Sequence, residues 1–198
     1  MRISRTIISL LALAVAASCA GQQEETASVS GNPVIENIMS RRSIRKYKAD
    51  PVARETLDKI LECGINAPNG QNKQSWEIRV VDNAAQVQEI QEAIGGTSFR
   101  GAPVMVFIAR DLSYDMSAYD CGLLFGNICL SAHSLGVGPI VLGSPVRAMN
   151  SLESARPYLE KLGFREGYEL CICVGLGYAD ETPDAKPRDI NKIKYVTL

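Results

Sequence analysis

Arginine side chains are concentrated in one short segment of the chain, together with a hydroxyl group. The segment contains Arg41, Arg42, Ser43 and Arg45. A guanidinium group offers paired N–H donors that match the oxygens of a phosphate, and a hydroxyl adds a further donor. A second, smaller basic cluster, with Lys186 and Arg188, lies near the C-terminus. The two clusters could converge on one anion or form separate solvated faces, and spacing alone leaves both interpretations open.

A polar loop between two apolar segments is the next candidate. Residues 67–76 read APNGQNKQSW, which is too rich in Asn, Gly and Gln for regular structure. Side-chain amides donate and accept hydrogen bonds from one group, so they suit the edge of a polar heterocycle. A plain turn-rich loop is the alternative interpretation.

A glycine-bordered apolar segment, GVGPIVLG at 136–143, could turn backbone N–H groups toward a ligand. It lacks the G-x-G-x-x-G order and the downstream acidic residue of a Rossmann fingerprint. Dinucleotide binding of the Rossmann kind is therefore excluded.

The elements that must position these residues alternate irregularly. Apolar periodicity and cap residues predict helices and strands of ordinary length. We expect helices over 33–42, 51–65, 84–94 and 117–135, strands over 76–81, 104–109, 140–142 and 169–174, short helices opening at 144 and 151, and a strand-like end at 194–196. This order favours a mixed α+β fold. The helix over 117–135 is apolar almost all round, which predicts a central or subunit-interface position.

Composition bounds the class of protein. The chain has 198 residues, of which 46% are hydrophobic and 22% charged, as in one globular domain. A net charge of −1 gives no indication of nucleic-acid binding. The chain has one His, and its six Cys do not occur in the paired spacing typical of zinc ligands, which argues against a metal site. The cysteines after Cys19 are expected to be buried free thiols, with Cys171 and Cys173 on one face of a strand.

The N-terminus has the pattern of an export signal. Arg2 and Arg5 precede an apolar run over 7–17, which is too short to span a membrane, and small residues then lead to Cys19. This arrangement resembles a bacterial lipoprotein signal. It implies a signal peptide over 1–18, a lipid on Cys19, a flexible tether over 19–32 and a folded domain over 33–198, anchored in the cell envelope on the periplasmic face or cell surface. A plain signal peptide with an incidental Cys is the alternative.

Four segments in this order resemble one family. RRSIRKY, APNGQNKQSWEIRVV, LGVGPIVLG before a strand ending in GLGY, and the C-terminal KPR are similar to the FMN-dependent nitroreductase family, over about 34–196. The resemblance implies an α+β fold with a mostly antiparallel central sheet flanked by helices. It also implies an intertwined homodimer with two FMN sites at the subunit interface, in which the helix over 117–135 is the central dimer helix.

The resemblance assigns the basic residues to FMN. Arg41, Ser43 and Arg188 would hold the phosphate, and Lys186 would reach the phosphate or the ribityl chain. Arg42 would bind through its main chain or side chain.

The flavin ring is implied to contact three further segments. Arg45 would lie near the N1–O2 edge, where a cation stabilises negative charge on the ring. The residues implied to line the ribityl chain and ring from the neighbouring subunit are Asn69, Gly70, Asn72 and Gln74. The backbone around Val141, Leu142 and Gly143 would approach the N5–O4 edge.

Two departures from the family pattern lie in the polar loop. Asn69 stands where the family usually has Ser, and Ser75 stands where Pro usually precedes Trp76. Both changes keep polar capacity, so FMN binding is expected to persist.

The implied function is that of an FMN-dependent oxidoreductase. It would pass electrons from a donor such as NAD(P)H to nitroaromatic, quinone or similar electron-poor acceptors by a ping-pong mechanism. No side-chain acid or base is required, and His133 is expected to be structural.

Export conflicts with this donor, because free NAD(P)H belongs to the cytosol. Three alternatives follow: an exported non-catalytic flavin-binding or electron-transfer lipoprotein, a specialised branch such as a reductive dehalogenase, and a surface interaction module without the cofactor. The intact basic clusters speak against the last.

Overall fold

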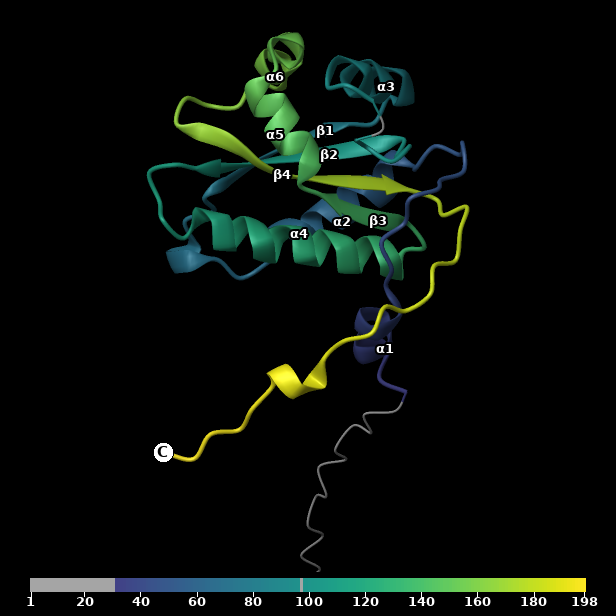
Figure 1. Ribbon diagram of the computed structural model, residues 1–198, viewed down its shortest axis with the longest axis vertical. Coiled ribbons are helices and arrows are strands. Elements are labelled where there is room, and N and C mark those ends of the chain that lie inside the picture. Colours follow the sequence, from purple (N-terminus) through teal and green to yellow (C-terminus); the bar gives the residue numbers. More distant parts are fainter. Residues whose placement is uncertain (1–30, 97) are drawn as a thin grey trace, which may run out of the picture. The chain divides into compact units, whose positions relative to one another are not determined.

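The structure, a computed structural model, describes residues 31–96 and 98–198 (Figure 1). The expected signal peptide, Cys19 and nearly all of the expected tether lie outside these residues. Pro33–Leu198 form one unit. Within the part of the chain described, no helix combines the length and hydrophobicity needed to cross a membrane.

A four-stranded antiparallel sheet forms the centre of this unit. Its strands are β1 (Trp76–Val81), β2 (Val104–Asp111), β3 (Gly138–Leu142) and β4 (Tyr168–Gly177), in the spatial order β1-β2-β4-β3. Every neighbouring pair is antiparallel. The continuous apolar run of β2 is buried because both faces of this central strand are covered. The predicted mostly antiparallel sheet is confirmed.

Helices cover both faces of the sheet. They are α2 (Arg54–Ile65), α3 (Ala84–Ala93), α4 (Ser117–Ser134), α5 (Ser144–Ser151) and α6 (Arg156–Leu162), whereas α1 (Pro33–Ser40) contacts α4 and does not cover the sheet. Figure 1 shows α2 and α4 on one face and α3, α5 and α6 on the other. Leu124 and Ile128 of α4 belong to the core on the first face, and Phe107 and Met149 to the core on the second.

The strand-like C-terminal end was a wrong prediction. Residues 193–198 have no regular structure, and the Tyr195 side chain is 100% exposed. An extended segment becomes a strand only when a neighbouring strand accepts its backbone hydrogen bonds. Within the described residues, this segment has no such neighbour in its own chain.

The cysteines of β4 also differ from expectation. A β-bulge opposite Ile108 and Ala109 inserts one residue into β4 and breaks its two-residue alternation. Cys173 therefore lies in the core beneath α5, whereas Cys171 packs against the core beneath α4. The two do not share a face, although all five described cysteines are free thiols.

The bulge brings Cys171 beside a thiol of α4. Cys171 and Cys121 share a hydrogen bond, which raises the pKa of Cys121. The same bond, with the nearby charge of Arg110, lowers the pKa of Cys171 to about 7 although partial burial acts in the opposite direction.

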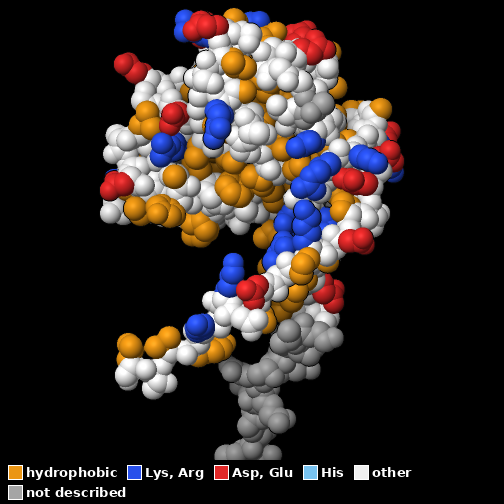
Figure 2. All heavy atoms as spheres, in the orientation of Figure 1, with side chains coloured by type: hydrophobic (Ala, Val, Ile, Leu, Met, Phe, Trp, Pro, Cys, Tyr) orange, Lys and Arg blue, Asp and Glu red, His pale blue; other side chains and the backbone are white. Residues whose placement is uncertain are grey.

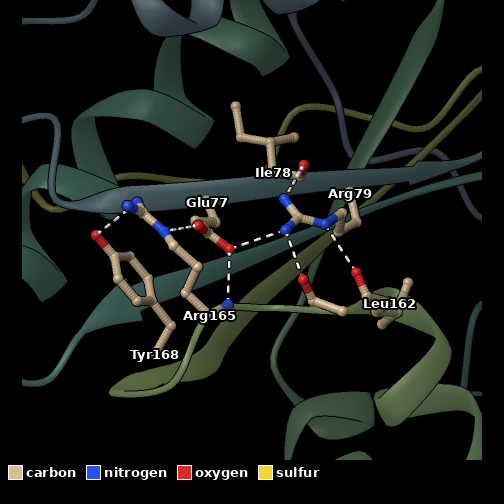
Figure 3. A network of polar contacts seen from close by, with 7 residues as sticks. Glu77, Ile78, Arg79, Leu162, Arg165 and Tyr168 are labelled. Atoms are coloured by element: carbon tan, nitrogen blue, oxygen red, sulfur yellow. Dashed lines mark hydrogen bonds and ion pairs between the residues drawn. The ribbon is translucent and has the colours of Figure 1, made fainter.

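Glu77, an acidic residue on β1, connects the sheet to the turn between α6 and β4 through its ion pair with Arg165. Figure 3 shows Glu77 between the guanidinium groups of Arg79 and Arg165. Arg79 Nε donates to the carbonyl oxygen of Leu162 at 2.7 Å, and its Nη2 donates to that of Gly163 at 2.7 Å. The network therefore also satisfies carbonyls at the end of α6.

Replacing Glu77 with Gln should destabilise the domain by about 1–2 kcal/mol, because charge-assisted bonds are lost. Burial acts to raise the pKa of Glu77, but the bonds from Arg165 and the charge of Arg79 outweigh it and lower the pKa. A lowered pKa stabilises the fold above the unfolded value of about 4.3, and this contribution disappears as the pH falls through the lower folded value. Urea unfolding should show that the difference in free energy of unfolding between wild type and Glu77→Gln becomes smaller below that pH. Glu166→Gln, at an exposed position, is the matched control. An equal difference between wild type and Glu77→Gln at pH 7 and at pH 3 would contradict the prediction.

Candidate functional site

The arginine segment is held against the edge strand of the sheet. The N–H of buried Ile44 donates to the Pro139 carbonyl oxygen on β3 at 3.1 Å. A Cβ atom on Gly138 would lie only 2.6 Å from Ile44 Cγ1, so a glycine is required for this close approach. The contact fixes the course of residues 41–45 immediately after α1.

The two basic clusters meet around one cavity of about 420 Å³. Its lining residues are Ile38, Met39, Arg41, Arg42, Ser43, Arg45, Pro183, Asp184, Ala185, Lys186 and Arg188. Figure 2 shows Lys and Arg side chains gathered where the C-terminal segment passes α1. The structure thus brings the residues of both basic clusters, whose convergence the sequence left open, to one cavity.

Backbone carbonyls, rather than carboxylates, accept hydrogen bonds from the guanidinium groups of Arg42, Arg45 and Arg188 around this cavity. Arg42 Nη1 donates to the Met39 carbonyl oxygen at 2.7 Å, and Arg45 Nη1 donates to that of Ser43 at 3.0 Å. Among the described residues, no ion pair involves any of the four arginines of the cavity. Their positive charge is therefore available to an anion, with exposed Asp184 the one acidic residue in the lining.

His133 supports the same segment from the C-terminal end of α4. Its Nε2 lies 2.9 Å from Ser40 Oγ at the end of α1. Partial burial lowers the pKa of His133, and the positive charges of Arg41 and Arg42 lower it further. A neutral imidazole joined to α1 fits the expected structural role.

The polar loop lies at the other end of α4. Its conformation is unusual because Gln71, Asn72 and Gln74 all have positive φ angles, of 54°, 54° and 49°. Asn69 Oδ1 accepts a hydrogen bond from the Gln74 N–H at 2.9 Å. Asp120, in the first turn of α4, accepts a bond from the Gly70 N–H at 2.9 Å.

One chain does not bring the loop and the basic cavity together. Asp120 contacts the loop and His133 contacts Ser40, which directly precedes the arginine segment, and the two residues are 13 positions apart on α4. At about 1.5 Å per residue this is a separation of about 20 Å along the helix. Asn69, Gly70, Asn72 and Gln74 therefore form a separate group within a single chain.

The third predicted segment is also apart from the cavity lining. Val141 and Leu142 end β3, and Gly143 precedes α5. Leu142 is buried in the core beneath α5, while Val141 and Gly143 are exposed. Their proximity to a ligand remains a prediction from the resemblance.

Asp120 is the important residue that the sequence analysis missed. It is 3% exposed and bonds to the loop through both carboxylate oxygens. The available signal was an acidic residue in an otherwise apolar helix, since a buried carboxylate needs fixed partners. No cluster of three or more His, Cys, Asp or Glu suited to a metal occurs among residues 31–96 and 98–198.

Known proteins share both the sequence pattern and the fold. Residues 38–99 match the nitroreductase family. A protein of Archaeoglobus fulgidus, provisionally named NADH dehydrogenase/NAD(P)H nitroreductase, is 31% identical over 156 residues, which are 76% of this chain and 87% of that protein. A protein of Methanothermobacter thermautotrophicus with the same name is 36% identical over 120 residues, covering 58% of this chain and 63% of that protein.

A solved structure extends this likeness to nearly the whole domain. The nitroreductase with bound FMN from Desulfitobacterium hafniense is 34% identical, with a TM-score of 0.77, and the match covers 84% of this chain and 99% of that one. The antiparallel sheet between two helical layers, with a basic cavity beside its edge strand, defines a nitroreductase-type fold. The chain belongs to the nitroreductase family.

Replacing Arg41 and Arg188 together with Ala should weaken anion binding at least tenfold. Each charge-assisted bond contributes about 1.5–3 kcal/mol, and about 1.4 kcal/mol corresponds to a factor of ten. Calorimetric titration of the flavin-free protein with inorganic phosphate would measure the loss. Arg147→Ala, an exposed arginine on α5 outside the cavity, is the matched control. Equal affinities in the double variant and the control would contradict an anion site here.

Proposed function

We propose that the protein is an FMN-dependent oxidoreductase that passes electrons from NAD(P)H to nitroaromatic, quinone or similar electron-poor acceptors in a ping-pong cycle. The observation that carries the proposal is the convergence of Arg41, Arg42, Ser43 and Arg45 with Lys186 and Arg188 around one cavity. The FMN bound in the Desulfitobacterium hafniense nitroreductase supports the cofactor, and the name of the Archaeoglobus fulgidus relative supports the donor.

The residues of the cavity fit the phosphate of FMN. A phosphate monoester carries about two negative charges at neutral pH and several acceptor oxygens. Arg41, Ser43 and Arg188 offer donors to those oxygens, and Lys186 adds a further cation. Because no carboxylate neutralises these arginines among the described residues, their charge can be used for the ligand.

When bound, FMN supplies the hydride and electron chemistry that the side chains of the chain lack. The protein's contribution is to bind and orient. The phosphate-binding residues fix one end of the cofactor, and Arg45 provides a positive charge toward the ring. The amide groups of Asn69, Asn72 and Gln74 offer hydrogen bonds to polar edges of the ring and the ribityl chain.

The complete site requires two copies of the chain. The basic cavity and the polar loop lie at opposite ends of α4, about 20 Å apart. A homodimer in which two α4 helices pack antiparallel would place the loop of one copy beside the cavity of the other.

Exposed apolar side chains support this assembly. Tyr119 and Leu123 of α4 are exposed, as is Met116 just before the helix, and so are Ile193 and Val196 of the C-terminal segment. Apolar surface of this extent is typical of an interface that a second subunit covers.

A form that begins at residue 19 and carries Cys19→Ser should be purified yellow, with about one FMN per chain. Anaerobic NADPH or NADH should then bleach the flavin absorbance, because the donor reduces it. A visible spectrum followed by identification of the released flavin measures both properties.

The double variant Arg41→Ala with Arg45→Ala is the matched test of the site. It should lose most of the bound FMN while retaining the circular dichroism of the folded domain. Unchanged flavin content in this variant would contradict the site assignment. Bound FMN that stays oxidised with both nucleotides would instead favour the electron-transfer lipoprotein.

The N-terminal sequence supports a further proposal about location. We propose that residues 1–18 are removed and that Cys19 carries a lipid that anchors the protein in the cell envelope. Two arginines, an apolar run, small residues and Cys19 stand in the required order. This location and an NAD(P)H donor exclude each other, because free NAD(P)H belongs to the cytosol. If the anchor is found, the donor is another redox carrier, and the second candidate, an exported electron-transfer protein, replaces the NAD(P)H-driven oxidoreductase.

Replacing Cys19 with Ser should abolish lipid attachment, because the thiol that carries the lipid is removed. The full chain, expressed in a bacterial host with labelled palmitate, should be labelled and found in the membrane fraction. Cys63→Ser is the control and should stay labelled. Equal labelling of the Cys19→Ser chain would contradict lipidation at this residue.

A further inference from the structure

We infer that Asp120 is a positioning residue that holds residues 69–75, the amide loop, in the conformation that presents its polar side chains to FMN. This inference rests on the proposed function, since FMN is the ligand to which the loop is presented. Neither the family resemblance nor the sequence pattern assigns a role to Asp120.

The Asp120 carboxylate joins both ends of the amide loop. Its Oδ1 accepts the Gly70 N–H at 2.9 Å, and its Oδ2 accepts the Ser75 hydroxyl at 2.6 Å. Asp120 is 3% exposed and Ser75 is 2% exposed, so water does not replace these bonds. Within the described residues, no Lys or Arg forms an ion pair with Asp120, and the carboxylate therefore depends on its loop partners.

The amide loop needs such a restraint because its backbone is strained. Gln71, Asn72 and Gln74 occupy the left-handed region, where a non-glycine residue is disfavoured by about 1 kcal/mol or more. Three such residues in a segment this short persist only when surrounding contacts fix them. The two bonds to Asp120 fix the segment at Gly70 and Ser75, on either side of all three.

Other contacts seat the loop beside Asp120. A Cβ on Gly70 would lie 2.1 Å from the Tyr114 hydroxyl, so a side chain at this position would displace the loop. Lys73 Nζ lies 4.1 Å from the centre of the Tyr114 ring, which is a cation–π contact. The Ser75 carbonyl oxygen accepts the Asp111 N–H at 3.0 Å and connects the loop to the end of β2.

The helix also provides a matched control. Ser117 lies one turn before Asp120 on α4 and is fully buried, yet its hydroxyl has no hydrogen-bond partner among the described residues. Ser117→Ala therefore removes a buried polar atom from the same helix without touching the amide loop.

Asp120→Asn distinguishes positioning from charge. The Asn Oδ1 can accept from the Gly70 N–H while its Nδ2 donates to the Ser75 hydroxyl, which can also accept. Both bonds are kept although the negative charge is removed. Asp120→Ala removes both bonds, and Ser75→Ala removes one.

The experiment measures the Kd for FMN and the protection of the loop amides from hydrogen exchange. The four variants are Asp120→Ala, Asp120→Asn, Ser75→Ala and Ser117→Ala. In the FMN-loaded dimer we expect Asp120→Ala to raise the FMN Kd at least tenfold and to change the visible circular dichroism of the flavin. Ser75→Ala should raise the Kd severalfold, while Asp120→Asn should stay within about threefold of wild type and restore the flavin spectrum. Ser117→Ala should match wild type.

Amide hydrogen exchange separates this inference from the proposed function. In flavin-free protein, exchange of residues 70–74 should accelerate at least tenfold in Asp120→Ala and stay near wild type in Asp120→Asn. Unchanged exchange in Asp120→Ala, or equal effects of Asp120→Ala and Ser117→Ala on Kd, would overturn the positioning role. A wild-type chain that binds no FMN would overturn the proposed function, while the exchange result would still decide whether Asp120 holds the loop. If Asp120→Ala does not fold, Ser75→Ala decides by the same measurements.

Discussion

The packing of α4 against the sheet determines where the basic cavity and the amide loop can lie. Leu124 and Ile128 bury one side of the helix in the core, and this fixes both of its ends relative to β3 and β1. The C-terminal end holds the arginine segment through His133 and Ser40, and the N-terminal end holds the amide loop through Asp120. The length of one helix therefore sets the distance between the arginine segment and the amide loop.

Positive side chains are concentrated at one place in this chain, although its net charge is close to zero. The net charge is −1, yet four arginines and a lysine line one cavity without a carboxylate partner in the described residues. Elsewhere, as around Glu77, the same side chain types are neutralised and serve stability. A guanidinium group held only by backbone carbonyls keeps its charge for a ligand, whereas one paired with a carboxylate does not. This difference separates the arginines proposed to bind FMN from those that stabilise the fold.

The hydrophobic pattern of the sequence predicted the helices and strands well, and the sequence predicted the candidate site in part. The strand Trp76–Val81 has the predicted bounds, and α4 ends one residue before the predicted position, because alternation and an all-round apolar helix are strong signals. The spacing of Arg41 and Arg188 left their meeting open and only the family resemblance implied it, whereas the structure places both in the lining of one cavity.

Three features depended on tertiary contacts that sequence patterns do not contain. The bulge that separates Cys171 from Cys173 breaks the regular two-residue period on which the prediction relied. The left-handed residues of the amide loop are not glycines, so propensity gave no sign of them. Asp120 looks like a surface residue until the folded loop supplies its two donors.

The separation of about 20 Å between Asp120 and His133 on α4 has a genetic consequence. In the proposed dimer, each site takes its basic cavity from one chain and its amide loop from the other. A chain damaged only at Arg41 and a chain damaged only at Asp120 would each be inactive alone. Mixed in one cell, they would form heterodimers in which one of the two sites is built entirely from undamaged halves. Two recessive alleles of the same gene would then complement one another.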